Sequence, residues 1–289
     1  MSHIGGLRAR FARRVVGVAI IGTAAGMLGA APGPSPREFR VCADPNNLPF
    51  SNRRGEGFEN RLAELIARDL GTRVRYEWMP QQRGFLRKTL KAGACDVVMG
   101  VPARYDPVLT TRPYYRSTYV FVYRAHGGPS VTSLDDSVLR QARIGIHVVG
   151  DDYANPPPAQ ALAARGIIDN VIGYPIIGDY SKANPPARLV EAVARGDVDI
   201  AVVWGPFAGY FAKHSPVQLA IVPVLPSQDV SGQPFAFDIA LGVRHGDTAL
   251  AARLDTLLVR ERPAVQRILA RYGVPQLPLA DTAARGAAP

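Results

Sequence analysis

The chain has 289 residues, of which 47% are apolar and 20% are charged, and its formal net charge is +10 at pH 7. This length supports one large hydrophobic core or two modest ones, and the composition excludes an intrinsically disordered chain. Beyond the first 30 residues, no stretch approaches the roughly 20 apolar residues that a membrane-spanning helix needs.

The first residues are typical of an export signal. Four arginines and no acidic residue accompany an Ala- and Gly-rich run over residues 15–30, which ends in small residues just before Pro32. We therefore expect a signal peptide over residues 1–31 and a periplasmic mature protein. An uncleaved anchor is disfavoured because the run is short and no stop-transfer cluster follows it. Cleavage would lower the formal charge from +10 to +6, so the mature protein stays basic.

Two cysteines, Cys42 and Cys95, remain in the mature chain. In an oxidising compartment they favour one disulfide, which would close a loop of about 54 residues and contribute about 3–4 kcal/mol by the loop-entropy argument. The alternative is a pair of separate buried thiols. The histidines are scattered without the spacing of metal ligands, so we expect no metal site.

The first half of the mature chain alternates between strand and helix patterns. Elements are predicted at residues 39–43 (strand), 58–70 (helix) and 73–78 (strand), from residue 85 to a stop at Gly93 (helix), and at 96–101 (strand). Gly71 stands where a left-handed residue would end the first helix. Because crossovers between parallel strands are right-handed, this order predicts a parallel sheet with helices on its faces.

The second half repeats the alternation after a loose segment at 125–129, where we place a domain boundary. A helix capped at 184–185 should run to Arg195, and two C-terminal helices should begin at Asp247 and Pro263. Two similar α/β units in an exported chain predict a bilobed fold with a ligand or partner site in its cleft. The remaining strands are expected at 117–123, 143–147, 170–174, 198–203 and 237–243.

Polar and aromatic residues follow the strands of the first unit, at the carboxyl ends where ligands of open α/β sheets bind. The loop 44–50 could serve a ligand or form a rigid turn. Arg83 could clamp an anion or begin a solvated helix. The cluster from Arg104 to Tyr115 could bind or line the lobe boundary. The candidate residues of this unit are Asp44, Asn46, Asn47, Phe50, Arg83, Arg104, Thr110, Thr111, Arg112, Tyr114 and Tyr115.

The second unit offers one further candidate, Trp204, which ends a strand and could stack on a ligand or fill the hinge. Asp151 and Asp152 match no calcium loop, and the three prolines at 156–158 indicate a stiff exposed loop. The chain has no Gly-x-Ser-x-Gly, Walker or His-Glu-x-x-His motif. We therefore predict no catalytic residue and no enzyme.

Several segments carry a family likeness, among them residues 41–52 (VCADPNNLPFSN), 55–60 (GEGFEN), 83–85, 91–93, 95–102 and 109–117. They resemble the MxaJ/XoxJ family, periplasmic proteins of the type II solute-binding fold that are associated with PQQ-dependent methanol dehydrogenases. The resemblance covers nearly all of the mature chain. It implies two α/β lobes, each a mainly parallel sheet flanked by helices, joined by strands near 118–123 and 237–243. A Cys42–Cys95 bridge would then tie neighbouring strands.

The expected organisation is a signal peptide, a first part of lobe 1, lobe 2, a return to lobe 1 and a disordered tail. Their bounds are 1–31, 32–124, 125–234, 235–279 and 280–289.

The resemblance also bears on function. In the wider amino-acid-binding family an arginine after the third strand grips the ligand carboxylate, and Arg104 stands at that position. The carboxylate that holds the ligand ammonium is replaced by Trp204, which cannot pair an ammonium ion without desolvation cost. We therefore expect an accessory protein that binds a PQQ-dependent methanol dehydrogenase in maturation or activation, aided by its basic surface. The alternative is the receptor of an ABC importer for a small anionic ligand. No cofactor, nucleic-acid partner or membrane insertion after signal cleavage is expected.

Overall fold

The computed structural model describes residues 38–148, 156–176 and 184–279. The predicted signal peptide, the acidic pair Asp151 and Asp152, and the predicted tail lie outside these ranges. Within them, no helix is both long enough and apolar enough to cross a membrane.

The chain forms two sheet regions that share β7 (Tyr115–Arg124), and we name the lobes by their elements. Lobe 1 comprises β1 (Glu38–Ala43), β2 (Asn46–Asn47), β3 (Ser51–Asn52), α1 (Phe58–Asp69), β4 (Arg73–Trp78), α2 (Phe85–Lys88), β5 (Val97–Pro102), β6 (Leu109–Thr110), β12 (Ala236–Val243), α6 (Thr248–Arg260) and α7 (Arg262–Arg271). Lobe 2 comprises a 3-10 helix (Ser137–Arg140), β8 (Ile144–Val148), α3 (Pro157–Ala164), β9 (Val171–Pro175), α4 (Ala187–Arg195), β10 (Ile200–Trp204), α5 (Gly205–Lys213) and β11 (Leu219–Pro223).

The sheet of lobe 1 is centred on β1, which pairs in parallel with β4 on one side and with β5 on the other. Strand β5 then pairs antiparallel with β12. Cys42 on β1 and Cys95, just before β5, form the predicted disulfide, and their Cα atoms lie 5.5 Å apart. The disulfide therefore joins neighbouring strands at the centre of the lobe.

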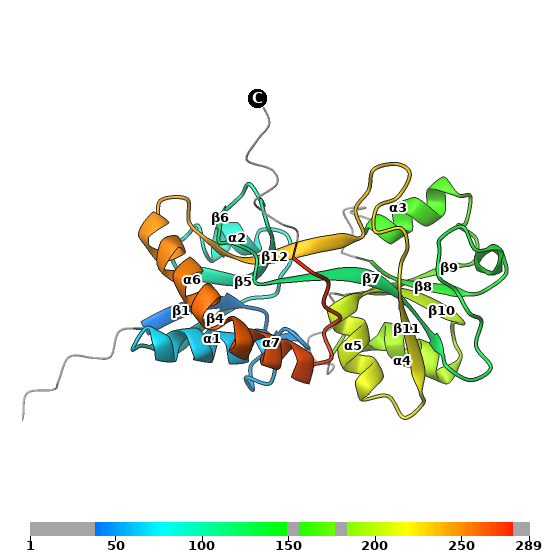
Figure 1. The fold of residues 1–289 in the computed structure, drawn as a ribbon, viewed down its shortest axis with the longest axis horizontal. Helices are drawn as coiled ribbons and strands as arrows, with labels where there is room; N and C mark the ends of the chain where they lie inside the picture. Colours follow the sequence, from blue (N-terminus) through cyan, green and yellow to red (C-terminus); the bar gives the residue numbers. More distant parts are fainter. Residues whose placement is uncertain (1–37, 149–155, 177–183, 280–289) are drawn as a thin grey trace, which may run out of the picture. The chain divides into compact units, whose positions relative to one another are not determined.

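Helices cover both faces of this sheet (Figure 1). Helix α1 buries a stripe of Phe58, Leu62 and Ile66 at helical spacing, and α6 and α7 pack in the same core. Each of these large side chains contributes about 1.5–3 kcal/mol when it is fully buried. Helix α1 ends as predicted, with Gly71 at a φ of 64°. The other face is covered by α2, whose Phe85 packs beside Cys42.

Lobe 2 has a parallel centre of β10, β8 and β9, flanked by antiparallel β7 and β11. Helices α4 and α5 pack on one face and α3 on the other. Helix α3 overturns the prediction that the prolines at 156–158 form an exposed loop. Pro157 and Pro158 lie in the first turn of α3, where a missing N–H costs nothing, and Pro158 is buried.

Strands β7 and β12 run side by side between the lobes (Figure 1). The first part of β7 pairs with β12, from Tyr115 to Thr118, and the rest pairs with β10 and β11. One strand thus belongs to both sheets, which confirms the predicted two-lobed α/β fold with hinge strands. The predicted lobe bounds themselves remain a prediction.

Candidate functional site

The loop after β1 is held in one conformation by the side chain of Asp44. This carboxylate is only 3% exposed, and it accepts hydrogen bonds from the backbone N–H of Asn46 and from that of Gln81, each at 2.8 Å. A charged acceptor that ties two backbone segments is a strong local restraint. Asp44 therefore fixes the loop that it begins, and it joins this loop to the segment after β4.

The end of the same loop is fixed by the start of α1. The backbone N–H groups of Phe58 and Glu59 have no partner within the helix and donate instead to the carbonyls of Pro49, at 2.7 Å, and Phe50, at 2.9 Å. Gly57 is required at this contact because a Cβ there would lie 1.9 Å from the Phe50 carbonyl oxygen. The motif at residues 55–60 thus works as a clamp on residues 49 and 50.

The clamped loop crosses from lobe 1 into lobe 2. Leu48 is 3% exposed and is a member of the core formed by β7, β10, α4 and α5. The Phe50 ring lies between Phe58 of lobe 1, at 5.1 Å between centroids, and Phe207 of lobe 2, at 5.0 Å. Asn46 adds a polar link, because its side-chain oxygen accepts the N–H of Asn184 at 3.2 Å. We call this contact region the junction.

A second contact of the junction lies where the chain leaves α7. The ring of Tyr272 stacks on that of Tyr210 of α5 at 5.8 Å, with 21° between the ring planes. Gly209 of α5 lies directly on the backbone of Gly273, because a Cβ on Gly209 would come within 1.8 Å of the Gly273 carbonyl oxygen. The Ser117 hydroxyl donates to the Pro275 carbonyl at 2.6 Å. The two lobes therefore meet here backbone to backbone.

The lobe 2 side of the junction contains a buried histidine. The His147 ring lies 5.2 Å from that of Phe207, and its Nε2 donates to the Pro186 carbonyl at 3.1 Å. Burial lowers the pKa of His147 to about 4, although the hydrogen bond to the Pro186 carbonyl opposes the shift. The lobe 2 side of the junction is therefore aromatic, and its histidine is uncharged at neutral pH.

Trp204 lies in the hinge. Its ring is 5.4 Å from Tyr119 of β7 and 5.8 Å from Phe237 of β12, and it packs against the cores of both lobes. Of the two roles predicted for this residue, the geometry matches the one in which it fills the hinge. A role in binding remains a prediction.

The cluster predicted between Arg104 and Tyr115 does not converge on one point. The Thr111 hydroxyl accepts the N–H of Leu241 on β12 at 3.1 Å, and the Tyr114 hydroxyl donates to the Met99 carbonyl at 3.0 Å. Tyr115 is a member of the lobe 1 core. These groups join β6 and β7 to the neighbouring strands.

The other members of this cluster lie apart on the surface of lobe 1. Thr110 pairs with Gly242 of β12, and its hydroxyl accepts the N–H of Arg104 at 3.4 Å. Arg104 is exposed and has a φ of 63°. Arg112 is also exposed, and its N–H donates to Asp255 of α6. Any binding role for these residues remains a prediction.

Arg83 lines a separate pocket of lobe 1, which we call the cationic pocket. Its cavity volume is about 650 Å³, and its lining residues are Gln81, Gln82, Arg83, Gly84, Phe85, Leu86, Arg87, Lys91, Val98, Gly100, Val101, Pro102, Tyr105 and Pro107. Three of them are cationic and none is acidic. The Asn47 side chain joins this pocket to the junction loop, because its Nδ2 donates to Gln81 Oε1 at 3.2 Å.

A buried carboxyl group lies behind Gly100 of the cationic pocket. Glu59 of α1 is 6% exposed, and a Cβ on Gly100 would lie 2.3 Å from its Oε1. No hydrogen bond or ion pair of this carboxyl group is found among the described residues. Burial raises the pKa of Glu59 to about 8, and the negative charge of Asp44 adds to the shift. Glu59 is therefore largely protonated at neutral pH.

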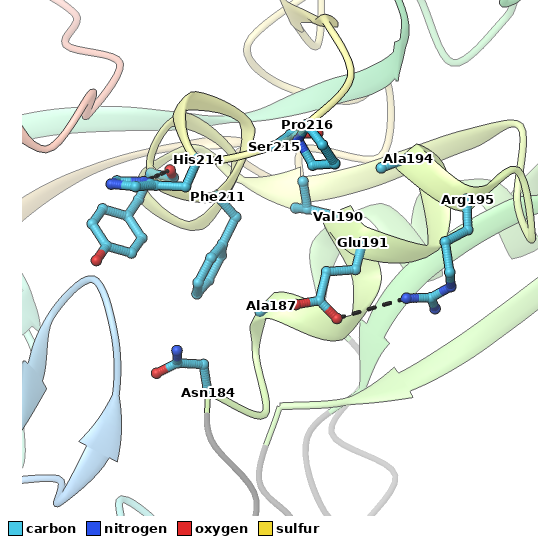
Figure 2. Close-up of a pocket in the computed structure, with 11 residues that line it drawn as sticks. Asn184, Ala187, Val190, Glu191, Ala194, Arg195, Phe211, His214, Ser215 and Pro216 are labelled. Atoms are coloured by element: carbon cyan, nitrogen blue, oxygen red, sulfur yellow. Dashed lines mark hydrogen bonds and ion pairs between the residues drawn. The ribbon is translucent and has the colours of Figure 1, made fainter.

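A further pocket of about 430 Å³ lies in lobe 2 between α4 and α5. Figure 2 shows Phe211 and Val190 at its apolar centre, and Glu191 and Arg195 form an ion pair of 3.7 Å on α4. The Nδ1 of His214 donates a hydrogen bond to the Tyr210 carbonyl of α5, so this nitrogen is already used within the protein. Apolar surface dominates this pocket, and the sequence offered no signal for it.

Comparison with known proteins identifies the family. The family model of the bacterial extracellular solute-binding proteins, family 3, matches residues 39–274. Protein MoxJ of Methylorubrum extorquens is 34% identical over 258 residues, which are 86% of this chain and 84% of that protein. The chain therefore belongs to the bacterial extracellular solute-binding proteins, family 3.

Two solved structures of the family carry the likeness further. The periplasmic binding protein XoxJ of Methylobacterium extorquens AM1 has a TM-score of 0.69 and 33% identity, over 83% of this chain and all of that one. MxaJ of Methlophaga aminisulfidivorans MPT has a TM-score of 0.71 and 28% identity, over the same shares of the two chains. The predicted MxaJ/XoxJ resemblance is thus confirmed, and this is a solute-binding protein of the methanol-oxidation-associated MxaJ/XoxJ branch.

For a member of the solute-binding family, the most informative residues are ones that sequence reasoning missed. Leu48, Phe207 and Tyr272 build the junction, while Arg87 and Lys91 complete the cationic pocket. The pocket had a usable signal, because residues 83–91 contain four cationic side chains and no acid. The junction had none, because nothing local distinguishes Leu48 from an apolar residue that packs beneath its own loop.

Proposed function

We propose that this protein is a periplasmic accessory protein of a PQQ-dependent methanol dehydrogenase, and that it binds the dehydrogenase in its maturation or activation. The observation that carries the proposal is the junction, where Leu48 of lobe 1 lies in the core of lobe 2 and Phe50 packs against it. The match to MoxJ, MxaJ and XoxJ supports the link to methanol oxidation.

Capture of a solute between two lobes requires free space between them and groups that pair with the charges of the solute. At the junction the chain's own side chains take up the space. Withdrawing Leu48 alone from lobe 2 would cost about 1.5–3 kcal/mol, which the binding of a solute would have to offset. A protein whose lobes are fastened in this way is suited to recognising a macromolecule with its fixed outer surface.

The proposal includes no chemical step on a substrate, and the solute-binding family supports a role in binding. The basic charge of the chain supports association with an acidic protein, because opposite net charges speed diffusional encounter. We therefore expect the protein to act through contact with the dehydrogenase or with its apo form.

The test uses the mature protein and the dehydrogenase of the same organism, with and without its quinone and metal. We expect saturable binding to at least one of these forms by biolayer interferometry, and a change in the specific activity of dehydrogenase matured in the presence of this protein. If neither form binds and the specific activity is the same with and without the protein, the proposal is wrong.

A second candidate function is that of a receptor for a small anionic ligand, and the cationic pocket with the exposed Arg104 favours it. A ligand present at 100 times its Kd should stabilise the folded protein by about 2.7 kcal/mol. A thermal-shift screen of small mono- and dicarboxylates against the purified protein would detect this. Stabilisation by one of these acids at micromolar concentration would favour the receptor over the accessory protein.

A further inference from the structure

The cationic pocket holds a local excess of unpaired positive charge. Arg83, Arg87 and Lys91 of its lining and the neighbouring Lys88 are all exposed, and no ion pair of these side chains is found among the described residues. Some arginines elsewhere in the described chain pair with acids, as Arg143 does with Asp199 at 2.7 Å, and others are exposed without such a pair, but in the cationic pocket three unpaired cations line one cavity. The segment 83–91 contains no acidic residue that could neutralise it.

Apolar side chains form the floor of this pocket. Phe85, Val98 and Val101 are buried there in a core cluster that also contains Cys42 and Cys95 of the disulfide. Tyr105 adds a ring that is 39% exposed. A cavity of about 650 Å³ falls in the size range of sites that bind a ligand or receive the side chains of a partner. An occupant therefore needs negative charge at its edge and an apolar group at its centre.

The backbone beneath the cations is well supported. The Gln81 N–H is held by the buried Asp44 carboxylate, and the Thr89 hydroxyl donates to the Phe85 carbonyl at 2.7 Å. Strand β5 has an irregular register beside β12 where it passes Gly100. Bulges of this kind re-aim strand ends and often lie next to functional sites. The pocket is thus preformed, and binding need not order its floor.

We propose that the cationic pocket is the docking site for an acidic segment of the protein partner, one that carries several carboxylates around an apolar or aromatic side chain. The inference rests on the proposed function and deepens it by naming the surface and the chemistry of the segment. Carboxylates would pair with Arg83, Arg87 and Lys91, and arginine offers two parallel donors to each. The central side chain would pack on the apolar floor, as the anchor residues of protein interfaces do.

Exposure of the cations favours a protein segment over a small acid. A single carboxylate on an exposed arginine gains little, because water and salt screen the pair. A segment fixed on a folded partner can make several such pairs at once, and it adds the buried anchor. The charges also accelerate encounter, so they are useful on an open surface where they would hold a lone small molecule poorly.

The experiment measures binding of the dehydrogenase to the full mature protein by biolayer interferometry at 25, 100 and 300 mM NaCl. The pocket variant combines Arg83→Glu, Arg87→Glu and Lys91→Glu. The matched control combines Arg188→Glu, Arg253→Glu and Arg267→Glu, which changes the net charge equally at exposed sites outside the pocket. Circular dichroism of both variants checks the fold, and a second, milder variant combines Arg87→Ala and Lys91→Ala.

At 25 mM NaCl we expect the pocket variant to raise the Kd at least tenfold and the milder variant at least threefold, whereas the control changes it less than threefold. The difference should shrink at 300 mM NaCl. Equal weakening by the pocket variant and the control would reduce the effect to general surface charge and overturn the inference.

Other outcomes separate the two levels of the proposal. Wild-type binding that all the variants retain would overturn the docking site and leave the proposed function standing. Absence of wild-type binding to either form of the dehydrogenase, together with an unchanged specific activity, would overturn both. A benzoate or succinate probe that binds the wild type at micromolar concentration and loses its affinity in the pocket variant would assign the pocket to a solute instead.

Discussion

The junction and the cationic pocket lie on either side of one loop and differ in almost every physical property. Leu48 of the loop 44–50 lies in the core of lobe 2 and Phe50 packs against that core, while Asp44 and Asn47 of the same loop hold Gln81 at the edge of the pocket. The junction is filled mainly by apolar and aromatic side chains, whereas the pocket is open and cationic. The difference supports the proposal that a partner is recognised at the cationic pocket of lobe 1 and that the junction serves to fasten the lobes.

The two regions are expected to differ most in how pH affects stability, because each region has a buried titratable group near it. Glu59 lies behind the pocket and His147 lies in the junction, and burial disfavours the charged form of both. The two shifts act in opposite directions on stability. Raising the pH charges the carboxyl group behind the pocket, and lowering it charges the imidazole in the junction.

The largest expected effect concerns Glu59. Its folded pKa of about 8 lies above its ordinary value of 4.5, so the folded protein keeps a proton that the unfolded chain loses. Stability should therefore fall as the pH rises from about 4.5 to 8, by on the order of 5 kcal/mol at about 1.4 kcal/mol per pH unit. Glu59→Gln should remove this slope in urea unfolding between pH 5 and 9.

The control for Glu59 is Glu64→Gln on the same helix, because Glu64 is exposed and forms a surface ion pair with Arg61. It should leave the slope as it is in the wild type. A Glu59→Gln protein that loses stability above pH 7 as steeply as the wild type would show that Glu59 is ionised in the folded state at neutral pH.

The next effect tests whether the junction joins the lobes. Leu48→Ala removes a fully packed side chain from the core of lobe 2, and we expect a loss of about 3 kcal/mol in the free energy of unfolding. Leu225→Ala, at a leucine that is 55% exposed, should change stability by less than about 0.5 kcal/mol. Urea denaturation followed by tryptophan fluorescence measures both. Equal values for the two variants would mean that Leu48 does not join the lobes in solution.

The third effect comes from His147. Its folded pKa of about 4 lies below the ordinary 6.5, so the unfolded chain binds a proton first as the pH falls. Stability should drop by about 2 kcal/mol between pH 6.5 and 5. Ionisation of Glu59 changes stability in the opposite direction over this pH range. The effect of His147 should therefore be measured in a protein that already carries Glu59→Gln. In that protein, His147→Gln should abolish the loss of stability between pH 6.5 and 5. His126→Gln, which changes an exposed histidine, should leave this loss as it is.

Much of the fold follows from local pattern. Phe58, Leu62 and Ile66 mark α1 by their spacing, and Gly71 marks its end. The order of strands and helices is enough for two parallel α/β units. Cys42 and Cys95 could be paired because the mature chain has no other cysteine. These signals are local or combinatorial, so a single sequence carries them.

Other features depend on tertiary packing and could not be derived in this way. The prolines at the start of α3 are of a type that serves turns and first helical turns equally well, so Pro157 alone did not indicate a helix. Helix α5 begins directly after Trp204, without the turn that usually separates a strand from a helix. Thr111 and Tyr114 have the chemistry of binding residues, and their hydroxyls are instead used by neighbouring strands.

The smallest expected effect separates the two regions most directly. Arg83→Ala, Arg87→Ala and Lys91→Ala should each change the free energy of unfolding by less than about 0.5 kcal/mol, because these side chains are exposed and no ion pair is found for them among the described residues. The combined variant should be as stable as the wild type or slightly more stable, because repulsion between like charges is relieved, and this gain should vanish at 1 M NaCl. Urea denaturation at low salt and at 1 M NaCl measures these changes in stability.

A loss of more than about 1 kcal/mol in the combined variant would show that the cations stabilise lobe 1 itself. If stability is unchanged, the cluster of positive charge does not contribute to folding, and recognition of a partner surface is then the physical role that accounts for it.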